Sequence, residues 1–307
     1  MQPRSTDYIA IGMFIAVLFC NSVLFGISRH IGETMGVGAF QVMFFYCWVG
    51  LLGLLPIVFK EGVGKVLKTT RWKLYGTRAL LEMASFSITI FALSLMTMPA
   101  HTALSFATPI IGSITAVIIL KEQPTHHTWV ALALGVLGVL AITQPWNATM
   151  EPLGLIMLLA GLGFALCGVS IKLLTSTESS TQIAFYMLFL TGLVAIPFAF
   201  NWVNVPNVSA PWVALDATLL PWVVGIGICS LLPQILVAKA YQRVPITTII
   251  PLNFLMLIFS SIIAYFFFAE VIELGTIIGA IIIIAATLYS TYGSSRKNAS
   301  AMDEPIV

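Results

Sequence analysis

Charge is the feature that this sequence lacks most. Asp, Glu, Lys and Arg make up only 8% of its 307 residues, whereas a typical soluble domain has about 25%. Hydrophobic residues reach 59%, and the mean hydropathy is +1.01. So few charges cannot cover a surface that faces water on all sides. The composition therefore excludes an ordinary soluble protein.

Cysteine and histidine are also scarce, with four of each. The cysteines all lie within apolar runs and lack the short spacings of metal ligands, so we expect neither a disulfide nor a metal site. The sequence has no Walker-type phosphate-binding loop, so we expect no direct coupling to ATP and no cofactor. We expect no nucleic-acid partner.

Apolar runs long enough to cross a bilayer recur along the whole chain. About 20 helical residues span the hydrocarbon core, and the runs lack the alternation of barrel strands. The sequence therefore predicts an all-α membrane protein of ten transmembrane helices. The predicted spans are 8–28, 36–59, 74–97, 102–120, 128–146, 153–174, 181–202, 219–243, 245–269 and 272–292.

The placement of basic residues predicts how these spans are oriented. If the N-terminus is cytoplasmic, every one of the 14 Lys and Arg residues except Arg29 falls at a cytoplasmic end or loop. Positive charge concentrates on the cytoplasmic side of membrane proteins, and one missed helix would destroy the pattern. We therefore expect both termini in the cytoplasm and a location in the plasma membrane, the inner membrane of a bacterium.

Two stretches repeat along the chain. Met98 to Glu122, MPAHTALSFATPIIGSITAVIILKE, aligns with Val244 to Glu270, VPITTIIPLNFLMLIFSSIIAYFFFAE. The segments QVMF from Gln41 and QIAF from Gln182 match in the same order. The repeat predicts two five-helix halves, 8–146 and 153–293. Because each half has an odd number of spans, the second enters the membrane upside down, as in alternating-access transporters with a site between the halves.

Prolines inside the spans predict where helices bend. Pro109 lies in the fourth span and Pro251 in the ninth. A proline frees a carbonyl, which is tolerated where the backbone lines protein or a cavity. We interpret both as bends of helices that face the shared interior, with a role in packing alone as the open alternative.

A pair of charges lies about two turns inside the third span. Arg78 and Glu82 are four residues apart, so they share one helix face and can neutralise each other. The alternatives are a buried stabilising pair and a Glu82 that faces substrate or carries a proton. The other polar candidates are uncharged and could instead bond neighbouring helices. The full set of candidate substrate-binding residues is Asn21, Arg78, Glu82, Ser105, Thr108, Gln234, Tyr241 and Asn253.

These motifs resemble the drug/metabolite transporter superfamily, specifically its EamA-type ten-helix members. The resemblance rests on Arg78 and on the doubled pattern that runs from proline to a terminal glutamate, and it covers essentially the whole chain. It is closest to the bacterial branch with riboflavin and S-adenosylmethionine importers, although Phe254 replaces the usual tyrosine there. The resemblance implies a cavity walled mainly by the first, third, fourth, sixth, eighth and ninth spans. It also implies that Glu122 and Glu270 cap helix ends.

The leading interpretation is a secondary transporter of a small organic metabolite, driven by a gradient or by exchange. It explains the inverted halves, the prolines and the interior polar set together. An intramembrane enzyme is one alternative, but no nucleophile and base or metal-ligand set marks a catalytic site. A channel or a non-transporting scaffold is another, because fold does not fix function. The expected partners are the metabolite and the bilayer, and a homodimer is left open.

Overall fold

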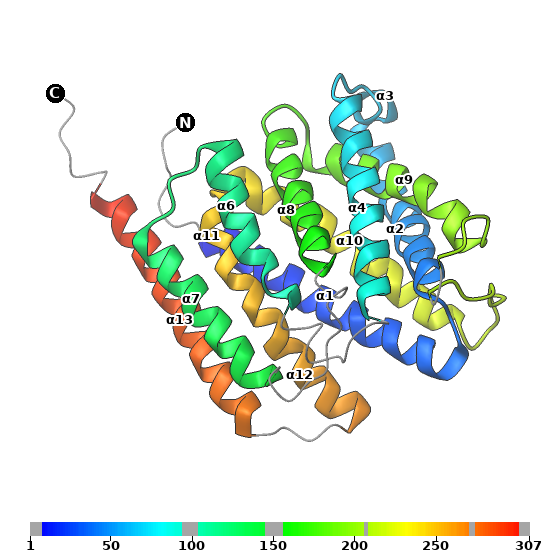
Figure 1. Ribbon diagram of the computed structural model, residues 1–307. Helices are drawn as coiled ribbons and strands as arrows, with labels where there is room; N and C mark the ends of the chain where they lie inside the picture. The colour runs from blue at the N-terminus through cyan, green and yellow to red at the C-terminus, as the bar shows by residue number, and fades with distance from the viewer. Residues whose placement is uncertain (1–7, 94–103, 145–155, 206–207, 270–273, 301–307) are drawn as a thin grey trace.

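The chain folds into a bundle of helices (Figure 1). The computed structural model describes residues 8–93, 104–144, 156–205, 208–269 and 274–300, and within these ranges it contains no strand. The helices are α1 Tyr8–Met35, α2 Ala39–Glu61, α3 Val63–Val66, α4 Trp72–Leu93, α6 Thr108–Leu120, α7 His126–Thr143, α8 Met157–Leu174, α9 Ser180–Ala199, α10 Leu220–Arg243, α11 Ile246–Ile249, the 3-10 helix η3 Ile250–Phe254, α12 Leu255–Phe268 and α13 Leu274–Ser300.

The helices follow the apolar runs closely. Within the described ranges, six helical segments are long and apolar enough to cross a membrane, and three apolar helices are shorter. A further helix, α4, has 22 residues and carries the charges of Lys73, Arg78 and Glu82. The all-helical class of a multi-pass membrane protein is therefore confirmed, whereas the count of ten spans stays a prediction.

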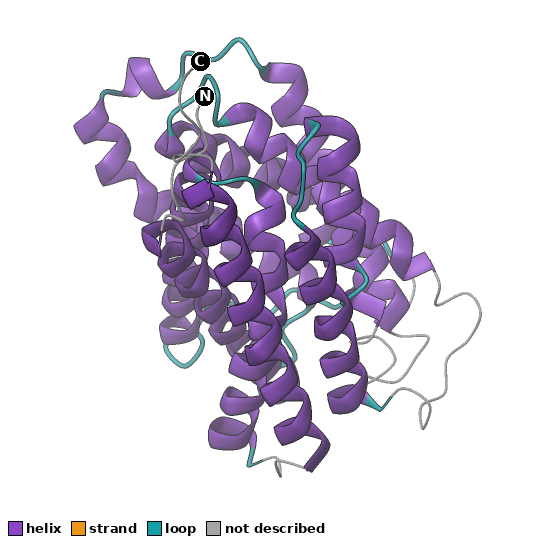
Figure 2. Cartoon of the chain, turned by 90° about the vertical axis from the view of Figure 1, so that its left-hand side faces the viewer, coloured by secondary structure: helices purple, strands orange, loops and turns teal. Residues whose placement is uncertain are grey.

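Helix neighbours follow a regular pattern. The first helix, α1, packs against α10 and α12, and α8 packs against α4 and α6. The helices α2 and α9 pack on each other, as do α7 and α13. Figure 1 shows α7 and α13 side by side at one edge of the bundle, and Figure 2 shows the bundle elongated along its helices.

Glycines let α7 and α13 approach backbone to backbone. A Cβ at Gly279 would lie 2.4 Å from the carbonyl oxygen of Gly138, and a Cβ at Gly275 would lie 2.7 Å from that of Ala141. Small residues allow such close contact in membrane helices, where packing rather than water expulsion holds helices together. The helices α7 and α13, which correspond to the predicted fifth and tenth spans, thus form a tight antiparallel pair.

The ninth predicted span is not a single α-helix. It begins as α11, continues as the 3-10 helix η3 that contains Pro251, and resumes as α12. A proline cannot donate the hydrogen bond that a continuous α-helix needs, so the change of helix type follows from the sequence. Pro109, by contrast, lies in the first turn of α6 and interrupts no described helix, a position that proline favours.

The helices α6 and α12 end in the same way. Their terminal residues, Lys121 and Ala269, have left-handed backbone angles, φ 54° and 52°. The backbone N–H of Lys121 donates to Ala116, and that of Ala269 donates to Ala264. Both caps immediately precede the matched glutamates Glu122 and Glu270 of the sequence repeat, of which Glu270 lies outside the described residues.

Glu122 binds the start of α11 rather than the end of its own helix. Its carboxylate accepts hydrogen bonds from the backbone N–H groups of Ile246 and Thr247, at 3.0 and 2.9 Å, and from the Thr247 hydroxyl at 2.8 Å. The ammonium of Lys172 donates to the carbonyls of Tyr241 and Val244 just before it. The junction between α10 and α11 is thus held from α6 and α8.

A carboxylate also caps the turn that leads into α10. Asp216 accepts hydrogen bonds from the backbone N–H of Leu219 and from the hydroxyl of Thr218, both at 2.8 Å. These hydrogen bonds hold the pKa of Asp216 below its ordinary value, with the Leu219 N–H as the largest cause. A carboxylate at this position also complements the positive end of the helix dipole.

Candidate functional site

A cavity of about 210 Å³ lies between the helices of the bundle. Seven elements line it, namely α1, α2, α4, α8, α9, α10 and η3. Apolar, aromatic, amide and charged side chains are mixed in its wall, as in small-molecule sites. The lining residues are Phe14, Val17, Leu18, Asn21, Tyr46, Arg78, Ile171, Met187, Pro233, Gln234, Val237, Tyr241 and Asn253.

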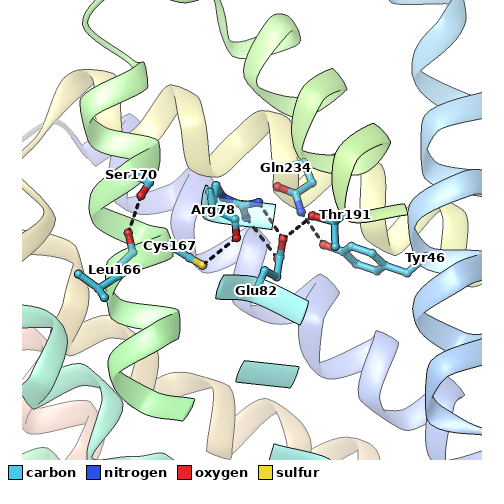
Figure 3. A network of polar contacts seen from close by, with 8 residues as sticks. All are labelled: Tyr46, Arg78, Glu82, Leu166, Cys167, Ser170, Thr191 and Gln234. Atoms are coloured by element: carbon cyan, nitrogen blue, oxygen red, sulfur yellow. Dashed lines mark hydrogen bonds and ion pairs between the residues drawn. The ribbon is translucent and has the colours of Figure 1, made fainter. Parts of the chain in front are cut away.

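The charge in this wall comes from an ion pair on α4 (Figure 3). The Arg78 nitrogens Nη1 and Nη2 donate to the two carboxylate oxygens of Glu82, at 2.7 and 3.2 Å. The hydroxyl of Thr191 on α9 donates to the same carboxylate at 2.8 Å. Arg78 is only 3% exposed. A two-pronged pair of this kind is stronger and more rigid than a single charged hydrogen bond.

A second polar contact crosses the cavity wall from α2 to α10. The side-chain amide of Gln234 donates to the hydroxyl of Tyr46 at 2.7 Å, and Figure 3 shows this contact beside Glu82 and Thr191. Phe14 on α1 stacks on Tyr241 on α10, with ring centroids 6.2 Å apart and ring planes 25° from parallel. The wall therefore offers both a polar network and flat aromatic surface.

The polar residues of the cavity wall differ in their hydrogen bonding. The Arg78 Nε is buried and has no hydrogen-bond partner among the described residues. Asn21 and Tyr241 line the same cavity. Asn253 donates its amide to the Ile250 carbonyl at 2.9 Å. Buried polar groups normally find partners, so the unpartnered Nε sets Arg78 apart from the other residues of the cavity wall.

The structure brings together most of the residues that the sequence singled out. Asn21, Arg78, Gln234, Tyr241 and Asn253 all line the cavity. The remaining candidates do not belong to the described lining.

Glu82 lies behind Arg78 as its partner. Thr108 begins α6 and faces α8, where its hydroxyl would be 2.9 Å from a Cβ at Gly161. Ser105 lies in the short helical turn before α6. Pro251 precedes the cavity residue Asn253 within η3, whereas Pro109 is buried at the start of α6.

Sequence reasoning missed three contributors. Tyr46 and Met187 bring α2 and α9 into the wall, which the resemblance had not implied, and no described residue of α6 lines the cavity. Thr191 completes the Glu82 site from α9. The available signal was a tyrosine and a threonine in the middle of otherwise apolar spans.

The chain is similar to known transporters along nearly its whole length. The model of the EamA-like transporter family matches residues 8–144 and again 153–292. The S-adenosylmethionine uptake transporter of Rickettsia felis is 30% identical over 294 residues, which cover 94% of this chain and 96% of that one. The riboflavin transporter of Brucella anthropi is 26% identical and covers 85% of this chain and 91% of its own.

A solved structure shares the fold. A crystal structure of another protein matches with a TM-score of 0.74, covering 92% of this chain and 98% of that chain at 13% sequence identity. At this sequence identity the match indicates only that the two proteins share the arrangement of their helices.

Proposed function

The chain belongs to the EamA-like transporter family, and from that premise we propose that it is a secondary transporter that works by alternating access. The family and the named relatives are transporters of small metabolites, not enzymes. The resemblance inferred from the sequence is thereby confirmed. Energy would come from a gradient or from exchange of one metabolite for another.

The observation that carries the proposal is the composition of the cavity wall. Arg78 comes from α4 in the first predicted half, whereas Gln234 and Tyr241 come from α10 in the second. A movement of one half against the other would therefore open the cavity to one side of the membrane or the other, as alternating access requires.

Two features of the fold support the inverted halves 8–146 and 153–293. The packing of α1 on α10 and α12 corresponds, after exchange of the halves, to that of α8 on α4 and α6. The left-handed caps at Lys121 and Ala269 occur at the same place in each half. Both features are expected if the halves are related by a two-fold axis in the membrane plane.

The wall chemistry favours an amphipathic substrate with a ring system and a charged group. Typical ligand pockets measure roughly 300–1,000 Å³, and the cavity here holds about 210 Å³. A nucleoside-sized substrate would thus need the halves to separate. S-adenosylmethionine is the first compound to test, because the Rickettsia felis relative is named for its uptake.

We place the protein in the plasma membrane, the inner membrane of a bacterium, with both termini in the cytoplasm. The basic residues from the last turn of α2 to the start of α4, among them Lys60, Lys65, Lys68 and Arg71, support this orientation.

Counterflow in proteoliposomes tests the proposal. Vesicles loaded with unlabelled S-adenosylmethionine should accumulate the labelled compound faster than empty vesicles show net uptake, because a carrier exchanges substrate. A channel would show no such stimulation. Gln234→Leu should reduce exchange at least tenfold, about 1.4 kcal/mol. The matched control is Gln242→Leu, at an exposed position at the end of the same helix. It removes only a hydrogen bond from Ser180 outside the cavity and should leave exchange unchanged.

A further inference from the structure

The connection between α2 and α4 is strongly basic. Residues 59–73, here called the basic connection, comprise the end of α2, the short helix α3 and the start of α4. They contain five basic residues and a single acidic one, Glu61. All five basic side chains are exposed, and within the described residues none of them forms an ion pair. The basic residues are Lys60, Lys65, Lys68, Arg71 and Lys73.

The acidic side chains next to the basic connection hold it in place. The Glu61 carboxylate accepts a hydrogen bond from the Thr181 hydroxyl at 2.8 Å. The Glu178 carboxylate, only 9% exposed, accepts one from the Thr69 hydroxyl at 2.8 Å. Both contacts link the connection to the start of α9. Since both carboxylates bind hydroxyl groups, neither pairs directly with an exposed lysine or arginine of the connection.

Further contacts with α9 fix the backbone of the basic connection. The Gln182 amide donates to the Lys68 carbonyl at 2.8 Å, and the Tyr186 hydroxyl donates to the Leu67 carbonyl at 2.7 Å. The Val66 side chain, 1% exposed, packs in one hydrophobic cluster with residues of α9. The exposed basic side chains therefore extend from an anchored backbone, so a partner that binds them has less chain to order.

Large apolar side chains are exposed among these basic residues. Phe59 is 68% exposed, Trp72 52% and Leu67 45%. The connection joins two predicted membrane spans, and Figure 1 shows α3 at one end of the bundle, so we expect it at the membrane surface. Tryptophan favours the level of the lipid headgroups. Basic residues that alternate with apolar ones are typical of segments that lie on anionic membranes.

We propose that the basic connection binds the phosphate headgroups of anionic phospholipids in the cytoplasmic leaflet. The lysine and arginine side chains pair with the phosphates, while Phe59, Leu67 and Trp72 contact the adjoining acyl chains. A lipid fits this surface better than a nucleic acid or an acidic protein segment, because it supplies hydrocarbon as well as negative charge. The inference rests on the proposed orientation and is independent of which metabolite is transported.

Two lipids with the same acyl chains and different headgroup charge test the inference. Purified protein in detergent is titrated with dioleoylphosphatidylglycerol or dioleoylphosphatidylcholine, and the Tm is measured at each lipid concentration. Phosphatidylglycerol should raise the Tm at a concentration about tenfold lower than phosphatidylcholine does, and high salt should reduce this difference. Equal responses to the two lipids would overturn the inference, and this comparison needs no variant.

Matched pairs of lysine substitutions locate the site. Lys65→Gln/Lys68→Gln should raise the midpoint concentration of phosphatidylglycerol about tenfold. The control, Lys121→Gln/Lys239→Gln, removes the same charge from exposed lysines on the same predicted side of the membrane and should raise it about twofold or less, because charges far from the site are screened. Equal shifts in the two double variants would overturn the inference, since they would indicate a general attraction between the positive protein and the lipid.

Soluble anions distinguish a lipid from the other partners. Inorganic phosphate and a short oligonucleotide carry negative charge without acyl chains, so each should raise the Tm much less than phosphatidylglycerol at the same phosphate concentration. An equal rise with either of them, lost in Lys65→Gln/Lys68→Gln, would overturn the lipid assignment in favour of a soluble anion or a nucleic acid.

Discussion

Gln41 and Gln182, which occupy matched positions of the sequence repeat, make the same kind of contact. The amide of Gln41 on α2 donates to the carbonyl of Val213, 172 residues away, at 2.6 Å. The amide of Gln182 on α9 donates to the carbonyl of Lys68, 114 residues away, at 2.8 Å. Each glutamine thus fixes the segment that leads into a helix of the other predicted half, α10 in one case and α4 in the other.

Removal of either glutamine should destabilise the protein. Gln41→Ala also leaves the backbone N–H of Val213 without its acceptor at 3.0 Å, and Gln41 is only 2% exposed. Loss of such buried hydrogen bonds costs about 1–3 kcal/mol. Thermal unfolding in detergent should show a lower Tm for Gln41→Ala and for Gln182→Ala. Equal Tm values for the wild type and both variants would contradict this role of the two glutamines.

Glu82 should be needed for stability as well as for transport. Glu82→Gln leaves the Arg78 guanidinium buried with its charge unbalanced, which costs about 3–5 kcal/mol in comparable pairs. The control is Glu33→Gln, which breaks the exposed pair with Arg29 that has the same i,i+4 spacing and should cost about 1 kcal/mol or less. Thermal unfolding distinguishes the two. A Glu82→Gln variant with wild-type Tm and no transport would instead assign Glu82 to substrate or proton binding.

The junction between α10 and α11 should depend on Glu122. Glu122→Ala removes three hydrogen bonds from Ile246 and Thr247, and loss of such a cap costs about 0.5–2 kcal/mol. Thr247→Val removes only the hydroxyl contact and should have a smaller effect. Unfolding midpoints in denaturant would measure both. If Thr247→Val proved the more harmful of the two, the carboxylate would not be the main contact at this junction.

Close packing of α7 on α13 should make Gly279 intolerant of any side chain. In Gly279→Ala the new Cβ would lie 2.4 Å from the carbonyl oxygen of Gly138, so the helices must move apart and lose contact. Overpacking of this kind costs about 1–3 kcal/mol. Gly12→Ala, with no atom within 4 Å of the new Cβ, is the control. A comparison of their Tm values should show a loss only for Gly279→Ala.

Helix positions could be predicted from the sequence because apolar length alone decides where a helix can cross a bilayer. The predicted span 219–243 agrees with α10, Leu220–Arg243, almost residue for residue. Helix ends were less predictable: α1 extends to Met35, seven residues past its predicted end at 28, and α13 extends to Ser300. Polar residues can continue a helix beyond the membrane, and hydropathy gives no signal there.

The candidate site was only partly predictable. Spacing on one helix was enough to pair Arg78 with Glu82, because residues four apart share a face. Contacts between helices far apart in sequence carry no such signal. The hydrogen bonds of Thr191 to Glu82 and of Gln234 to Tyr46 therefore needed the structure, as did the finding that Thr108 faces α8 instead of the cavity.

Cysteine accessibility at Asn21 tests alternating access most directly. The four native cysteines are first replaced by alanine or serine. Asn21→Cys is then compared with Leu137→Cys, whose parent side chain on α7 is 56% exposed and does not line the cavity. A membrane-impermeant maleimide should label Asn21→Cys when added from either side of the membrane, and substrate should slow both reactions. Labelling of Asn21→Cys from one side only, whatever the substrate conditions, would contradict the account.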